Sequence, residues 1–284
     1  MQDFTLHTHT IGFDGQNTPA EMIACARDVG LHAIGISNHF IVHPNVKRAN
    51  FYRAAKIGGY PAIYSESFEE AIDKFAPHYA ELSVLAADAG IKVYRGMEVD
   101  FFETPGWANG FSHACEILQP DYLIGAVHLI EYNQGLCNMH DIKAAPLRYR
   151  TEMVAEYWRK VVHAAESGLF AWMAHIDLPK KVDADDDVIM AHIHEHVISR
   201  IAKSGTAIEI NNSRFDRGMV DPHPSRSIME MVAQHNIPVV ISDDAHQVAH
   251  VGRHFVRGEQ FGRDCGVKNF LTLQKILDFR HKTI

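Results

Sequence analysis

The chain has 284 residues, of which 46% are hydrophobic and 22% are charged, so it can form one large globular core or two small ones. Its net charge of −8 and pI near 6.2 argue against a nucleic-acid partner, which would need a basic surface, and favour a small-molecule substrate. No run approaches the ~18 apolar residues of a membrane span, no signal-peptide region is present, and the four cysteines form no CxxC pair, so we expect a reduced, cytoplasmic protein without a membrane partner.

Short apolar runs rich in β-branched residues alternate with amphipathic stretches along the whole chain. The predicted strands cover residues 4–6, 33–36, 91–99, 122–127, 170–174, 207–210 and 238–241. The predicted helices cover residues 19–30, 67–90, 146–168 and 187–203, and the first opens with a Thr18-Pro19-Ala20-Glu21 capping box. Residues 43–64 are predicted to be irregular. This alternation predicts an α/β fold, a closed parallel barrel, formed by residues 1–284 as one domain.

Six of the seven predicted strands end in a side chain that can bind metal. These side chains are His7 and His9, His39, Glu98, His128, His175, and Asp244 and His246. The carboxyl ends of the strands in a parallel barrel open onto one face, so these residues should converge there. Residues i and i+2 of an extended chain point the same way, which lets each of the two pairs grip one ion.

A single histidine at a strand end is more often a structural residue than a ligand, but the joint pattern favours a metal site. The richer segment 192–196 is less favourable, because in a helix only His192 and His196 would share a face. Nitrogen and carboxylate donors without thiolate suit Zn²⁺, Mn²⁺ or Fe²⁺ better than Mg²⁺ alone. Their number exceeds the needs of one ion, so we expect two or three divalent metal ions.

The motifs HTHT, SNH, GMEVDF, DYLIGAVH, AHIDL, EINNS and SDDAH occur in this order between His7 and His246. In this order they resemble the polymerase and histidinol phosphatase (PHP) family. DYLIGAVH, EINNSR and the segment 223–246 resemble its monofunctional histidinol-phosphate phosphatases in particular. The resemblance implies a distorted (β/α)7 TIM-like barrel, which agrees with the number of predicted strands.

The resemblance also implies a role for each ligand. His7, His9 and Asp244 would hold a first metal, Glu98 would bridge to a second, and His128 and His175 would complete the second site. Asp14, His39 and His246 would hold a third metal. Asp14 lies in the loop Gly12-Phe13-Asp14-Gly15, which spacing alone does not single out. The family usually has an acidic residue where this chain has Asn38, and it commonly has a Cys-Pro-His sequence that is missing near Asp14.

We therefore expect a phosphate monoester hydrolase that attacks phosphorus with a metal-bridging hydroxide. The expected substrate is L-histidinol phosphate, cleaved to L-histidinol and phosphate in histidine biosynthesis. Glu98, Asp244, His246 and Arg214 are the expected catalytic residues, and Arg214 and Lys180, with Lys181 beside it, are the candidates for phosphate binding. The alternatives are a PHP phosphoesterase for a nucleotide or sugar phosphate, an amidohydrolase-like metal hydrolase, and a metal-binding scaffold or proofreading module.

Overall fold

Seven parallel strands form a nearly closed barrel in the computed structural model, which describes residues 2–181 and 187–279 and no side chains at 180–193. In spatial order the strands are β1 (Phe4–Thr5), β2 (Ala33–Ile36), β5 (Lys92–Asp100), β6 (Tyr122–Ala126), β9 (Trp172–Met173), β10 (Ala207–Asn211) and β11 (Val239–Ser242). Beyond the strand ends, β1 and β11 meet at one bridge, where the His9 amide donates to the Ala245 carbonyl at 2.8 Å. The prediction of a (β/α)7 barrel is confirmed.

The second strand of the barrel is interrupted. Its continuation, β3 (His39–Val42), pairs with β5 in the register His39 to Glu98, while β2 pairs with the first half of β5. The Glu98 amide lies at the break, 3.1 Å from the Ser37 carbonyl. His39 is therefore the first residue of β3 and not part of a loop after β2. It lies directly beside Glu98.

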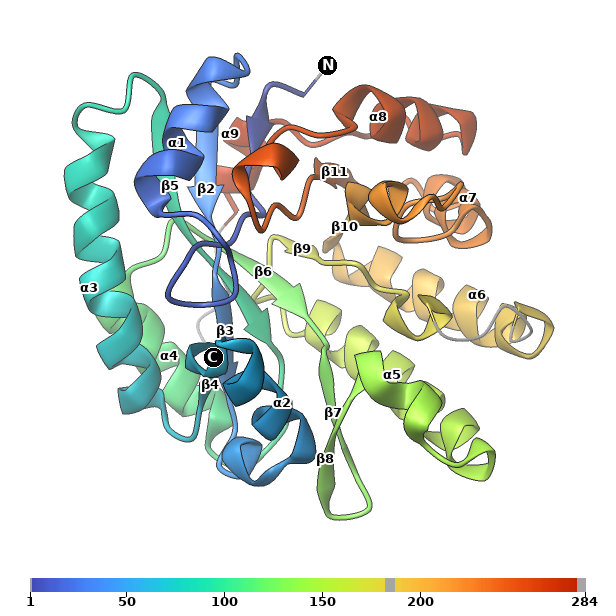
Figure 1. Ribbon diagram of the computed structural model, residues 1–284. Coiled ribbons are helices and arrows are strands. Elements are labelled where there is room, and N and C mark those ends of the chain that lie inside the picture. Colours follow the sequence, from blue (N-terminus) through green and yellow to red (C-terminus); the bar gives the residue numbers. More distant parts are fainter. Residues whose placement is uncertain (1, 182–186, 280–284) are drawn as a thin grey trace.

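Helices surround the strands (Figure 1). They are α1 (Pro19–Asp28), α3 (Phe68–Ala86), α4 (Trp107–Leu118), α5 (Leu147–Glu166), α6 (Asp187–Ser204), α7 (Arg226–Gln234), α8 (Phe255–Asp264) and α9 (Leu273–Leu277). The capping box of Thr18 and Glu21 is present, and the four predicted helices lie within a few residues of their predicted bounds. In the described part of the chain, no helix is long and apolar enough to cross a membrane.

Besides helices α4, α7, α8 and α9, for which no bounds were predicted, two features of the chain were not predicted. The segment 43–64, predicted to be irregular, contains helix α2 (Asn50–Gly58) between the 3-10 turns η1 (Val46–Arg48) and η2 (Pro61–Ile63), and it leads into β4 (Tyr64–Ser65). Ala49 at the start of α2 provides no capping side chain, so the usual sequence signal is missing. A hairpin of β7 (Leu129–Tyr132) and β8 (Gly135–Asn138) turns at Asn133 and Gln134, which have positive φ without glycine.

Aromatic packing fills one end of the barrel. Tyr122 and Trp172, at the beginnings of β6 and β9, stack with their ring centroids 5.6 Å apart. A Cβ atom on Gly96 would lie 2.2 Å from the Tyr122 ring, so only glycine leaves room for it. Further along the strands, the interior of the barrel contains two buried carboxylates, Glu98 of β5 and Glu209 of β10. The carboxyl ends of the strands therefore hold the polar part of the barrel.

Candidate metal centre

The structure brings together the nine side chains that the sequence singled out as metal ligands. Their donor atoms form four overlapping groups, in each of which they lie within 4.8 Å of one another. The groups are His9, Asp14, His39 and His246; His7, His175 and Asp244; His7, His9 and Glu98; and His39, Glu98 and His128. The residues come from β3, β5 and the segments that follow β1, β6, β9 and β11.

Glu98 lies in the middle of these groups and is 1% exposed. Its Oε2 is 2.8 Å from His39 Nδ1, 3.4 Å from His7 Nε2 and 3.6 Å from His9 Nε2. Its Oε1 is 2.9 Å from His175 Nε2 and 3.6 Å from His128 Nε2. One carboxylate thus faces five imidazole rings, with each oxygen directed to a different set. This is the arrangement that a ligand shared between two ions requires.

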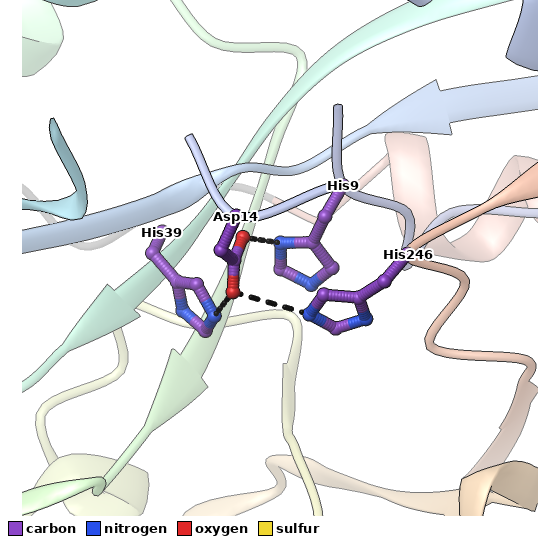
Figure 2. Close-up of side chains that lie close together, drawn as sticks. All are labelled: His9, Asp14, His39 and His246. Atoms are coloured by element: carbon purple, nitrogen blue, oxygen red, sulfur yellow. Dashed lines mark hydrogen bonds and ion pairs between the residues drawn. The ribbon is translucent and has the colours of Figure 1, made fainter. Parts of the chain in front are cut away.

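Asp14 forms a second focus, between three imidazole rings (Figure 2). Its Oδ2 is 3.1 Å from His39 Nε2 and 3.2 Å from His246 Nε2, and its Oδ1 is 3.5 Å from His9 Nδ1. Asn38, which begins no strand and precedes His39, accepts a hydrogen bond from the Thr10 amide at 2.8 Å. Asn38 therefore holds the segment that leads to Asp14.

Backbone conformation is unusual at two of the predicted ligands. His175 has a φ of 22° and Asp244 a φ of 47°, both in the left-handed region that disfavours non-glycine residues. The Asp244 carboxylate lies 3.5 Å from His9 Nε2 and 3.6 Å from His7 Nε2, and it accepts from Asn211 Nδ2 at 3.0 Å. Such conformations cost roughly 1–3 kcal/mol each and concentrate at functional sites.

The electrostatics of the cluster depend on the balance between burial and neighbouring charge. Burial alone would raise the pKa of Glu98, but the rings of His39, His7 and His128 hold it well below its ordinary value. Burial opposes a charge on His7 and His39 too, yet the facing carboxylates raise the pKa of both rings well above 6.5. Burial, followed by the charge of His246, lowers the pKa of His9 to about 4.

Several buried donor atoms in the cluster have no hydrogen-bond partner within the described part of the chain. They are His7 Nε2, both ring nitrogens of His9, Asp14 Oδ1, His39 Nδ1 and Glu98 Oε2. Leaving buried polar atoms unsatisfied is costly, and here they point toward one another. Their nitrogen and oxygen donors suit divalent transition metals, so the residues present fit a metal cluster.

Glu209 supports the cluster and was not predicted. Its Oε1 is 2.6 Å from His7 Nδ1, and its Oε2 accepts a hydrogen bond from the His175 amide at 3.0 Å. A carboxylate behind a ligating histidine fixes the ring orientation and the tautomer. The available signal was a glutamate inside an otherwise apolar buried strand.

Asp177 and His223 form a second buried pair that was not predicted. The His223 ring contacts Asp177 through Nδ1, and the Ser225 amide donates to the same carboxylate at 2.9 Å. Burial opposes the charge of Asp177, but His223 lowers its pKa to about 2. These residues are 46 positions apart, so no local pattern could have paired them.

A cavity of about 580 Å³ opens beside the cluster. Asp14, His39, Glu98, His128, His175, Asp244 and His246 line one side of it. The segment 43–64 lines another side with Phe51, Tyr60, Ile63 and Tyr64. Among the described residues, Arg217 and Arg253 are the arginines in its lining. The cavity therefore joins the candidate metal centre to an apolar wall and to two cations.

The remaining predicted positions lie elsewhere or outside the described side chains. Arg214 is 7% exposed in η6 (Asn212–Arg217), where its charge acts on Asp177, and it is not in the cavity lining. The side chains of Lys180, Lys181 and His192 are not among those described. In the 192–196 segment, the His194 ring packs against Trp158 with the centroids 4.9 Å apart.

A parallel barrel with a carboxylate–histidine cluster at the carboxyl ends of its strands defines the class of metal-binding TIM-like barrels. Within that class, the family model described as the PHP domain matches residues 3–213, and the chain belongs to the PHP domain family. The chain is 26% identical to a "Probable histidinol-phosphatase" of Deinococcus radiodurans over 283 residues, which cover 99% of this chain and 96% of that protein.

Two solved structures share the fold. HisK of Listeria monocytogenes matches with a TM-score of 0.65 and 14% identity, covering 89% of this chain and 99% of that chain. Histidinol phosphate phosphatase HISK of Lactococcus lactis, complexed with zinc, L-histidinol and phosphate, matches with a TM-score of 0.63 and 14% identity. That match covers 95% of this chain and 96% of the other.

Proposed function

We propose that the protein is a metal-dependent phosphate monoester hydrolase that cleaves L-histidinol phosphate to L-histidinol and inorganic phosphate, a step of histidine biosynthesis. The observation that carries the proposal is Glu98, a buried carboxylate facing five imidazole rings beside an open cavity. The Deinococcus relative, similar over nearly its whole length, supports the choice of substrate. The Lactococcus protein supports zinc, since its structure holds zinc together with L-histidinol and phosphate.

Two or three divalent ions, Zn²⁺, Mn²⁺ or Fe²⁺, fit the donors. We assign His7, His9 and Asp244 to a first ion and His128 and His175 to a second, with Glu98 shared between them. Asp14, His39 and His246 would hold a third ion. The donor atoms of these three residues lie within 4.8 Å of one another and of a ring nitrogen of His9. When bound, such ions activate water near neutral pH and neutralise charge on the phosphoryl oxygens.

The side chains around the cluster have separate tasks in this proposal. Glu98, Asp244 and His246 hold the centre in a fixed geometry, so the reacting groups meet with little reorganisation. The wall of Phe51, Tyr60, Ile63 and Tyr64 receives the leaving alcohol and excludes water from it. The phosphate needs a fixed cation, and we propose Arg214 or Lys180 for this task.

The direct test is phosphate release from a panel of monoesters, with metal analysis of the same sample. We expect more than one transition-metal ion per chain and the highest kcat/KM for L-histidinol phosphate. If a nucleotide or a sugar phosphate is the best substrate, the protein is still a phosphatase, but L-histidinol phosphate is not its substrate. If fully active protein contains one ion or none, the proposed multinuclear centre is wrong.

Arg214→Ala separates phosphate binding from metal binding. Guanidinium has five donors and no lone pair to offer a metal, so the variant should keep its metal content. It should bind substrate and inorganic phosphate more weakly by roughly 1.5–3 kcal/mol, the range for a charged hydrogen bond. Phosphate inhibition constants and elemental analysis measure the two effects.

Two further variants serve as controls for this experiment. His7→Ala should behave in the opposite way, losing metal first and activity as a consequence. Arg217→Ala removes an arginine that does line the cavity. If Arg217→Ala weakens phosphate binding while Arg214→Ala does not, the phosphate contact belongs to Arg217.

A further inference from the structure

Arg253, in the segment between β11 and α8, is bound to the backbone of a proposed metal ligand. Its Nε and Nη2 donate to the Asp243 carbonyl at 3.1 and 2.9 Å, and Nη2 also donates to the Asp244 carbonyl at 3.3 Å. Nη1 donates to the Asp216 carboxylate. The side chain is only 9% exposed, although it reaches the lining of the cavity. One guanidinium therefore joins two consecutive carbonyls to a carboxylate.

The backbone of Asp244 needs such support. Its φ of 47° lies in the left-handed region, which costs a residue other than glycine roughly 1–3 kcal/mol and persists only where the surroundings hold it. In this conformation the carboxylate lies 3.6 Å from His7 Nε2 and 3.5 Å from His9 Nε2. A change of φ would turn the side chain away from these two rings. The strained backbone is therefore part of the proposed ligand set.

The Asp244 carbonyl also orients a second proposed ligand. It lies 3.1 Å from His246 Nδ1, and because a carbonyl can only accept, this ring nitrogen must donate. The tautomer with a proton on Nδ1 leaves Nε2 free to bind metal, and Nε2 faces Asp14 at 3.2 Å. The carbonyl that Arg253 binds thus stands behind His246 as well.

Asp243 closes the same segment from the other side. Its buried carboxylate accepts hydrogen bonds from the Thr5 hydroxyl of β1 and from the Gly252 amide, both at 2.6 Å. Its carbonyl receives the guanidinium of the next residue, Arg253. All three guanidinium nitrogens are directed at the protein, which leaves Arg253 poorly placed to bind a phosphate. Lysine could not reproduce these contacts, since it carries one nitrogen on a flexible stem.

We propose that Arg253 is a positioning residue, whose planar guanidinium holds the backbone of Asp243 and Asp244 so that Asp244 and His246 present their donor atoms to the metals. Arg253 acts through carbonyl groups and contacts neither the metals nor the phosphate. This inference rests on the proposed metal centre. Groups that stand behind metal ligands typically contribute 10- to 100-fold to metal affinity.

The experiment compares the Zn²⁺ affinities of Arg253→Lys and Arg253→Met with that of the parent, by competition with a chromogenic chelator. Arg253→Lys keeps a cation that can pair with Asp216 but loses the planar fork. Both variants should bind at least one Zn²⁺ roughly 10- to 100-fold less tightly than the parent. At saturating Zn²⁺, both should keep the parental inhibition constant for inorganic phosphate. A merely structural role would not separate the two measurements in this way.

Arg257→Met is the matched control. Arg257 of α8 also donates to two consecutive carbonyls, those of Met219 and Val220 at 3.2 and 3.4 Å, but outside the metal centre, so this variant should keep parental Zn²⁺ affinity. Parental affinity in Arg253→Lys would overturn the inference, because a single charge would then suffice. Weaker inhibition by phosphate at saturating Zn²⁺ would overturn it too, by placing the guanidinium on the phosphate. If Arg253→Met does not fold, Arg253→Lys decides alone.

The failure of this inference can be told from failure of the proposed function. A parent protein that binds no Zn²⁺ removes the metal centre and this inference together. A parent that binds Zn²⁺ and hydrolyses the phosphate ester, with Arg253 variants that bind Zn²⁺ equally well, removes only the role of Arg253. Melting temperatures of all four metal-free proteins show whether a loss of affinity comes from a loss of folded protein.

Discussion

Replacing Glu98 with glutamine is expected to lower kcat by about 1,000-fold, which corresponds to roughly 4 kcal/mol of transition-state stabilisation lost with a shared metal ligand. The amide keeps the shape of the side chain but removes its charge and one of its two anionic oxygens. Glu98 faces five imidazole rings, so no other described carboxylate can replace it from the same position. Steady-state kinetics with a phosphate monoester, at saturating metal, measures the effect.

Glu103→Gln is the control for that variant. Glu103 follows the same strand, but it pairs with Arg159 at 2.6 Å on the surface. It should therefore keep parental turnover. Near-normal kcat in Glu98→Gln, with an unchanged circular dichroism spectrum, would show that Glu98 is not shared between ions.

Removing the metals is expected to lower the melting temperature by roughly 8 °C for each tightly bound ion. Each ion stabilises the folded state by about 4 kcal/mol when free metal is ~1,000-fold above the Kd. For a chain of this size, each kcal/mol of stability changes the melting temperature by about 2 °C. The physical reason is that binding to the folded state alone stabilises it. Differential scanning calorimetry before and after chelation, with metal added back, measures the effect.

The same experiment has a pH dependence with a definite sign. Burial opposes a charge on His7 and His39, but their carboxylate neighbours raise the pKa of both rings well above 6.5 in the metal-free protein. Stability from a raised histidine pKa is fully present below the unfolded value and is lost as pH rises through the folded value. Metal requires the deprotonated rings and replaces that lost stability. The difference in melting temperature between loaded and chelated protein should therefore widen as the pH rises above about 6.5, the ordinary histidine value.

A difference that stays constant or narrows over this range would contradict the pairing of these histidines with the carboxylates. Addition of Mg²⁺ to the chelated protein is a useful control, since Mg²⁺ prefers oxygen donors and should restore less stability than Zn²⁺.

The seven barrel strands could be predicted because each is a short apolar run followed by a polar side chain, and both properties are local. The barrel then brings these strand ends together, which is why eight of the proposed ligands could be chosen from spacing. Their roles as ligands stay predictions, as does the single domain over residues 1–284. Asp14 came only from the family resemblance, since a turn aspartate has no periodic signal.

Other features could not be read from local patterns. Helix α2 lacks a capping residue, and the β7–β8 hairpin turns without glycine. The pairs Glu209 with His7 and Asp177 with His223 join positions that are far apart in the chain, so they exist only once the barrel has closed. Arg217 and Arg253 reach the cavity from segments after β10 and β11, and neither residue was predicted to do so.

The cavity wall and the metal ligands come from separate pieces of the chain. The ligands lie at strand ends fixed by the barrel, whereas Phe51, Tyr60 and Ile63 belong to an excursion between β3 and β4. Changes in the length or sequence of that excursion reshape the space offered to the leaving group and leave the donor atoms in place. Chemistry and selectivity can therefore diverge independently in this architecture, and exchanging the excursion between relatives is the natural route to retargeting it.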